Sequence, residues 1–122
     1  MKLNILLGTL SLATCLVFGT PVVLADPLPP PPLSVVGLIS AYSAFYGVSS
    51  STLYKVLNCE SQMNPGAIGD NGTSFGIAQI HLPAHPDITK QEALDPNFAI
   101  PWTALQFSLG RQKMWSCYTK LV

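Results

Sequence analysis

The sequence is poor in charged side chains and has no excess of either sign. Lys and Arg together number 6, and Asp and Glu together number 6, so the formal net charge is zero and charged residues make up 10% of the 122 positions. Globular domains average about 25% charged residues. Without a basic or acidic surplus, binding of nucleic acid or of an anionic membrane surface is excluded as the main activity.

Motifs of several large enzyme classes are also missing. The chain has no Walker loop, no dinucleotide fingerprint, no zinc-protease helix and no nucleophile elbow. We therefore expect neither a cofactor nor a bound metal. Because only 6 carboxylates are present, the acids that could carry out chemistry can be considered one by one.

The start of the chain has the composition of an export signal. No charge occurs between Lys2 and Asp26, an apolar run lies at 5–18, and a small-residue cleavage site follows at 23–25. This pattern predicts a signal peptide over 1–25 and an exported protein, located in the periplasm, the cell wall or the extracellular space. An uncleaved leader that anchors the chain is the alternative, because an uncharged stretch of this length can span a bilayer.

A proline-rich segment, 26–33, separates the leader from the rest of the chain. Proline restricts φ and has no amide hydrogen, which favours an extended polyproline II conformation. The segment is predicted to be a stiff linker, with a ligand for aromatic grooves as the alternative. The remaining residues, 34–122, are few enough to form one domain.

From Ser34 onward, apolar residues recur with the period of an α-helix. The pattern predicts a first helix, with Ser34 as its N-cap and Gly47 as its stop, and a second helix after the serine run 49–51. Apolar spacings of three and four residues support the first helix, at Val35, Leu38, Ile39, Tyr42, Phe45 and Tyr46.

The second half of the chain is predicted to be helical with many loops. Turn-forming residues fill 64–72, a short helix is expected from Asp87 to Leu94, and another begins at Asp95 and is restarted or kinked by Pro101. A final helical turn is expected at 115–118. No segment is predicted to be a strand, so the expected fold class is mostly α, a small helical domain with a Gly-rich loop region.

One carboxylate differs from the others. Four acids are accounted for as helix caps, as a solvated helix position or as part of the linker: Asp87, Asp95, Glu92 and Asp26. Glu60 lies seven positions after Leu53 and therefore on the apolar face of the second helix. Because burial disfavours the charged form, we expect Glu60 to be protonated, as a general acid for glycoside cleavage must be. A partly exposed surface glutamate is the alternative.

The residues around Glu60 follow a distinctive order. The second helix ends in Glu60-Ser61, Asn64-Pro65-Gly66-Ala67 follows, and then comes Ser74-Phe75-Gly76-Ile77-Ala78-Gln79-Ile80. This order resembles the catalytic domain of the soluble lytic transglycosylases, in the lysozyme-like superfamily. In that family the catalytic Glu precedes a Ser, an Asn-Pro-x-Ala turn and a Gly-x-x-Gln segment that lines the glycan cleft. The match covers residues 42–81, and 95–109 more loosely.

The resemblance implies a lysozyme-like fold, a substrate and a mechanism. The implied substrate is the β-1,4 bond of peptidoglycan between N-acetylmuramic acid and N-acetylglucosamine, and the implied partner of this monomer is the glycan strand. Glu60 would protonate the leaving oxygen and then deprotonate the muramyl 6-hydroxyl, closing a 1,6-anhydro ring. Substrate contacts are implied for Gln79 and around Ser74 and Gly76. Ser61 is assigned either a substrate contact or a hydrogen bond at the helix end.

Two departures from the family leave other functions open. The family's Ala-Tyr-Asn motif is missing, and Tyr118 is the candidate substitute for its Tyr. The domain is also shorter than typical members, so the far wall of the cleft is expected to be reduced or supplied by another chain. One alternative is a hydrolase with Asp70 as a second carboxylate, about 5–9.5 Å from Glu60. The other is a non-catalytic wall-binding or structural module.

Three cysteines are present, and Cys15 lies in the leader. In an exported chain the other two, Cys59 and Cys117, are expected to form a disulfide that ties the second helix to the C-terminal segment. Two alternatives use the same sulfur atoms. They are a zinc site completed by His81 and His85, and a cysteine-peptidase pair of Cys59 with His81.

Overall fold

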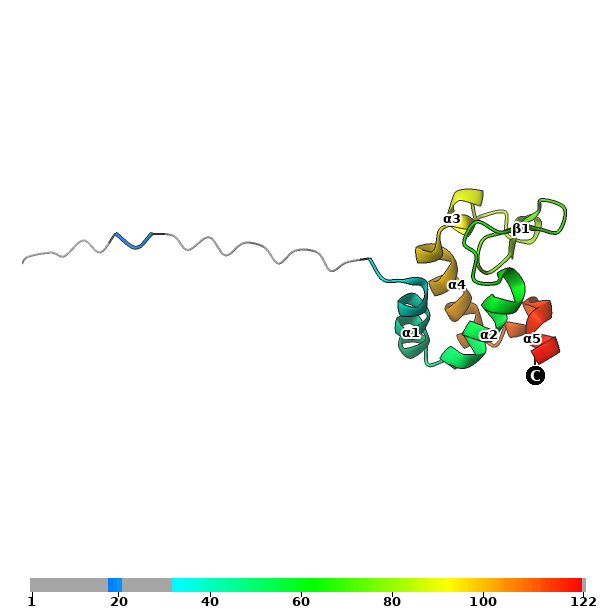
Figure 1. Cartoon of the computed structure of the whole chain (residues 1–122), viewed down its shortest axis with the longest axis horizontal. Helices are drawn as coiled ribbons and strands as arrows, with labels where there is room; N and C mark the ends of the chain where they lie inside the picture. Colours follow the sequence, from blue (N-terminus) through cyan, green and yellow to red (C-terminus); the bar gives the residue numbers. More distant parts are fainter. Residues whose placement is uncertain (1–17, 21–31, 122) are drawn as a thin grey trace, which may run out of the picture. The chain divides into compact units, whose positions relative to one another are not determined.

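Helices make up most of the part of the chain that the computed structural model describes, residues 18–20 and 32–121 (Figure 1). The predicted signal peptide and linker lie outside the described residues, apart from 18–20 and 32–33. In chain order the elements are α1 (Val35–Tyr46), α2 (Ser50–Ser61), β1 (Ile68–Gly69), β2 (Ser74–Phe75), β3 (Ile80–His81), the 3-10 helix η1 (Leu82–Ala84), α3 (Lys90–Leu94), α4 (Pro96–Ser108), the 3-10 helix η2 (Gln112–Met114) and α5 (Ser116–Leu121).

The first two helices begin where the sequence predicts. The Ser34 hydroxyl accepts a hydrogen bond from the Gly37 amide at 3.1 Å, and the Ser49 hydroxyl accepts one from the Thr52 amide at 3.2 Å. Each bond satisfies an amide that has no partner inside its helix. Gly47 ends α1 with a φ of 67°, a left-handed conformation that glycine adopts without strain.

The prediction that the chain has no strands is wrong. The three strands form an antiparallel sheet in the order β1-β2-β3, with Ile68 opposite Phe75 and Ser74 opposite His81. Each strand is 2 residues long, which is too short for an alternating apolar pattern. The sheet therefore depends on pairing between segments, and local sequence alone does not specify it.

Two details of the later helices also differ from the prediction. The N-cap of α3 is Thr89 and not Asp87. The Glu92 side chain completes a capping box, because it accepts a hydrogen bond from the Thr89 amide at 2.8 Å. Pro101 neither restarts nor ends α4, which runs through it. The proline removes the hydrogen bond that would reach the carbonyl of Asn97, and Asn97 is exposed, so water can replace the missing donor.

The hydrophobic core lies between the helices. Helix α1 packs against α2 and α4, and α2 packs against α5. Leu53, Val56 and Leu57 are fully buried, which confirms the apolar stripe expected for α2. In Figure 1, α3 and the sheet lie at one end of the folded part, and α1, α2 and α5 lie toward the other. No helix in the described residues has both the length and the apolarity that a membrane span requires.

Candidate functional site

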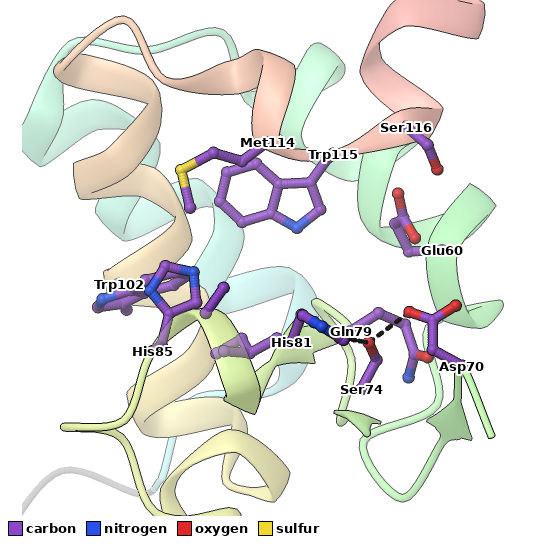
Figure 2. Close-up of a pocket in the computed structure, with 12 residues that line it drawn as sticks. Glu60, Asp70, Ser74, Gln79, His81, His85, Trp102, Met114, Trp115 and Ser116 are labelled. Atoms are coloured by element: carbon purple, nitrogen blue, oxygen red, sulfur yellow. Dashed lines mark hydrogen bonds between the residues drawn. The ribbon is translucent and has the colours of Figure 1, made fainter. Parts of the chain in front are cut away.

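A cavity of about 570 Å³ opens beside the end of α2 (Figure 2). This volume is within the range of small-ligand sites. The residues that line it come from α2, the sheet region, η1 and the residue after it, α4, and the segment from the end of η2 to the start of α5: Glu60, Asp70, Ser74, Gln79, Ile80, His81, Ala84, His85, Trp102, Met114, Trp115 and Ser116.

Glu60 lies in the last turn of α2, at the edge of the pocket. The side chain is half-buried, at the margin of the apolar face on which Leu57 is completely buried. Its Oε1 accepts a hydrogen bond from the Cys117 amide at 3.1 Å. Within residues 32–121, Oε2 has no hydrogen-bond partner. One oxygen therefore holds the carboxyl group in place, and the other is available to a ligand.

The disulfide between Cys59 and Cys117 is present, as the sequence predicts, with the two Cα atoms 6.0 Å apart. The disulfide links Cys59, which directly precedes Glu60, to Cys117, whose backbone amide donates a hydrogen bond to Glu60. Both sulfur atoms are used, so neither is a thiolate for the zinc site or for the cysteine-peptidase pair. In the part of the chain that the structure describes, no group of three His, Cys, Asp or Glu side chains is placed to hold a metal. The bond is typical of proteins that fold in an oxidising compartment outside the cytoplasm.

Asp70 lines the same pocket as Glu60, and Figure 2 shows both carboxyl groups at its margin. Asp70 follows β1 and has a φ of 49°, in the left-handed region that Asp tolerates better than most residues. One of its oxygens accepts a short hydrogen bond from the hydroxyl of Ser74. The turn is closed by the amides of Gly72 and Thr73, which both donate to the carbonyl of Gly69, at 3.0 and 3.1 Å. Asp70 therefore sits in a hydrogen-bonded turn.

Aromatic side chains form another part of the pocket lining, and their place in the site was not predicted from the sequence. Trp115 is buried and its indole N–H donates to the carbonyl of Ala78 at 2.8 Å. The half-buried ring of Trp102 lies 5.9 Å from that of Trp115 and 4.9 Å from the ring of His85, edge to face in both cases. The pocket thus combines carboxylates with apolar rings, which suits a ligand with hydroxyl groups and flat apolar faces, as a pyranose has.

Four of the residues predicted to act at the site line the pocket: Glu60, Asp70, Ser74 and Gln79. Gln79 also holds the loop together, because its side-chain amide donates to the carbonyls of Ala67 at 3.2 Å and of Gly76 at 2.9 Å. The side-chain nitrogen of Gln79 is therefore already engaged within the protein.

Three other predicted residues do not line it. The Ser61 hydroxyl has one hydrogen, which the carbonyls of Leu57 at 3.1 Å and of Ile77 at 2.7 Å share, so this hydrogen is engaged within the protein at the helix end. Gly76 is buried against the backbone of Ala93. Tyr118 packs against Phe107, with ring centroids 6.0 Å apart, and lines a separate hollow.

His85, Trp102 and the segment from Met114 to Ser116 belong to the pocket although their sequence context gives little sign of it. One signal in the sequence could have placed Trp115 and Ser116 at the site. They directly precede Cys117, which was predicted to pair with Cys59, the neighbour of Glu60. No family model, no curated protein and no solved structure matches the chain. The geometry of the pocket, together with the resemblance of the residues around Glu60, is what supports a functional proposal.

Proposed function

We propose that this protein is a lytic transglycosylase that cleaves the bond between N-acetylmuramic acid and N-acetylglucosamine in peptidoglycan, with a lysozyme-like arrangement of its helices. The observation that carries the proposal is the state of Glu60. One of its oxygens is held by the Cys117 amide at 3.1 Å, and the other has no hydrogen-bond partner among the described residues and lies at the edge of a ligand-sized pocket. A carboxyl group held in this way can serve as a general acid and then as a base.

The proposed reaction uses Glu60 twice. Glu60 first gives its proton to the glycosidic oxygen, and the bond from that oxygen to the anomeric carbon breaks with its electron pair on the oxygen. The oxygen of the muramyl 6-hydroxyl then bonds to the anomeric carbon, and its proton returns to Glu60. The product is a 1,6-anhydro sugar, and neither a nucleophilic side chain nor a cofactor is consumed.

The pocket supports this reaction through its shape and chemistry. The rings of Trp102 and His85 offer apolar surface for the faces of a sugar, and the pocket around Ser74 and Asp70 offers hydrogen-bonding groups. Glycan strands are the proposed partners, encountered by an exported monomer. Contact with the membrane is proposed only through the leader, if it stays attached.

A hydrolase is the second candidate, and the position of Asp70 favours it. Asp70 lines the same pocket as Glu60, so a second carboxylate is available to activate water. In that case the products have reducing ends. A module that binds the wall without cutting it is less well supported, because binding alone does not require a carboxylic acid with one anchored and one free oxygen.

Digestion of peptidoglycan sacculi tests the proposal. The purified protein should release anhydro-muropeptides, each lighter by one water than the corresponding reducing muropeptide, as measured by mass spectrometry. Glu60→Gln should lower the rate of release by about 10²–10⁴-fold with little loss of stability. Asp87→Asn is the matched control, because Asp87 is exposed and lies outside the pocket.

Each outcome of the digestion separates the candidates. Reducing-end products would replace the transglycosylase with the hydrolase. Wild-type protein that binds sacculi and releases nothing would leave only the binding module. A Glu60→Gln protein that clears sacculi at the wild-type rate would overturn the role of Glu60.

A further inference from the structure

The turn between β1 and β2 contains the only Asn-Gly pair in the sequence, Asn71-Gly72. Both residues are exposed, and no atom beyond the neighbouring residues lies within 4 Å of the position that a Cβ of Gly72 would take. Within residues 32–121 the side chain of Asn71 has no hydrogen-bond partner. The amide group of Asn71 is therefore free to turn toward the next backbone nitrogen, and Gly72 has no side chain to shield that nitrogen.

An asparagine followed by glycine can react with its own backbone. The Gly72 nitrogen gives its proton to water and bonds to Cγ of Asn71, and the side-chain nitrogen takes up a proton and leaves as ammonia. Water then opens the resulting succinimide ring at one of its two carbonyl carbons. Opening at Cγ gives aspartate, and opening at the backbone carbonyl carbon gives isoaspartate, in which the main chain runs through Cβ and Cγ. One water is consumed, one ammonia is released, and no oxidant or enzyme is required.

The folded turn restrains this reaction only weakly. The Gly72 amide donates to the Gly69 carbonyl at 3.0 Å, and this bond must open before the nitrogen can attack. Asp70 and Asn71 have φ values of 49° and 54°, in the left-handed region that is unfavourable for residues with a Cβ. The closed turn is thus raised in energy, and its opening at an exposed position disturbs little packing. We expect Asn71 to react about 10-fold more slowly in the folded protein than in the unfolded chain, through the one hydrogen bond that must open.

The other asparagines in the described part of the chain lack this combination. Asn58 lies inside α2, where the backbone is held by helical hydrogen bonds. Asn64 precedes Pro65, whose nitrogen has no hydrogen to lose. Asn97 is in the first turn of α4, and its side-chain nitrogen donates to Asp95 at 3.1 Å. These three residues are built-in controls for the reactivity of Asn71.

We propose that Asn71 is a site of spontaneous conversion to aspartate and isoaspartate, and that the isoaspartate form changes the sheet side of the pocket. Isoaspartate adds one carbon to the main chain between Asp70 and Ser74, which line the pocket and are hydrogen-bonded to each other. The Thr73 hydroxyl also donates to the carbonyl of Asp70, at 2.7 Å. Both links span residue 71, so a longer main chain displaces one partner from the other.

Peptide mapping by mass spectrometry tests the conversion in the intact protein, folded and in urea, during incubation in a mildly alkaline buffer. The peptide that contains Asn71 should change from the amide to the acid, with more isoaspartate than aspartate. The rate should increase with pH, because the Gly72 nitrogen must lose its proton. Asn71→Gln should block the change, since the longer side chain forms a less favourable ring. Conversion of Asn71 in the folded protein no faster than that of Asn58, Asn64 and Asn97 would overturn the proposal.

The effect on the pocket is tested on the isoaspartate form, which ion exchange separates from the unreacted protein by its added charge. The variant Asn71→Asp is the matched control, because it adds the same charge and keeps the length of the main chain. In NMR spectra the amide signals of Asp70 and Ser74 should shift more in the isoaspartate form than in Asn71→Asp. Equal shifts in the two proteins would show that the turn absorbs the extra carbon, and would overturn the change in the pocket.

The consequence for glycan release rests on the proposed function. The isoaspartate form should release fragments about 10-fold more slowly than fresh protein, because the pocket no longer positions the substrate, whereas Asn71→Asp should stay within about 2-fold. Release by the isoaspartate form at the rate of fresh protein would refute this consequence and leave the proposed function standing. If fresh protein releases nothing, the proposed function fails, and the mapping and the NMR shifts still decide the inference about Asn71.

Discussion

The Cys59–Cys117 disulfide is expected to control both the stability of the domain and the position of Glu60, the proposed catalytic residue. Cys59 directly precedes Glu60, and Cys117 donates its amide to Glu60 at 3.1 Å. Cys117 also follows Trp115 and Ser116, which line the pocket. Reduction, or the double substitution Cys59→Ser and Cys117→Ser, releases the segment 115–117. This segment carries the amide that holds Glu60 and two of the residues that line the pocket.

The size of the effect follows from the length of the loop that the disulfide closes. The two cysteines are 58 positions apart. Closing a loop of this length in the unfolded chain is worth about 4 kcal/mol at 25 °C in the chain-entropy relation, and measured disulfides contribute about 2–4 kcal/mol. A domain of this size has a total stability of roughly 5–13 kcal/mol. Each kcal/mol shifts the melting temperature by about 4–8 °C, so the loss should be on the order of 8–32 °C.

Thermal unfolding followed by circular dichroism measures this directly. The oxidised protein is compared with the protein reduced by a phosphine and with the double serine variant, and a chelator serves as the control. Glycan release is then measured at a temperature at which the reduced protein is still folded. We expect it to fall as well, because Glu60 loses the amide that orients it.

Two results would refute this reasoning. One is a melting temperature of the reduced protein within about 3 °C of that of the oxidised protein. The other is a pair of freely alkylatable thiols at Cys59 and Cys117 in the exported protein. A melting temperature that falls with the chelator would instead restore the zinc site.

Three further substitutions test contacts that hold the fold together, each by urea unfolding. Gly76→Ala should destabilise the domain by about 3–5 kcal/mol, because a Cβ would overlap the carbonyl of Ala93 and φ is 80°; an unchanged midpoint would contradict that contact. Trp115→Phe should cost about 1–3 kcal/mol, since the carbonyl of Ala78 loses its donor; a cost near zero would show that water replaces it. Asp95→Ala should cost about 1 kcal/mol through loss of the α4 cap, and Asp95→Ser should recover most of it.

Much of the local structure could be predicted from the sequence, because it depends on neighbouring residues. Ser34 and Ser49 cap their helices through amides three residues ahead, and Gly47 ends α1 because glycine adopts a positive φ without strain. The spacing of the apolar residues placed Glu60 on the apolar face of α2, and in the structure it is half-buried at the margin of that face. The pairing of Cys59 with Cys117 followed because these were the two cysteines outside the leader.

The tertiary structure alone decided which groups meet at the pocket. The Cys117 amide reaches Glu60 across 57 positions, and the Trp115 indole reaches the Ala78 carbonyl across 37. The register of two-residue strands placed His81 opposite Ser74. Helical periodicity and capping describe interactions within a few residues, whereas these contacts depend on how distant segments fold back on one another. Single residues at the site were therefore predictable, and their partners were not.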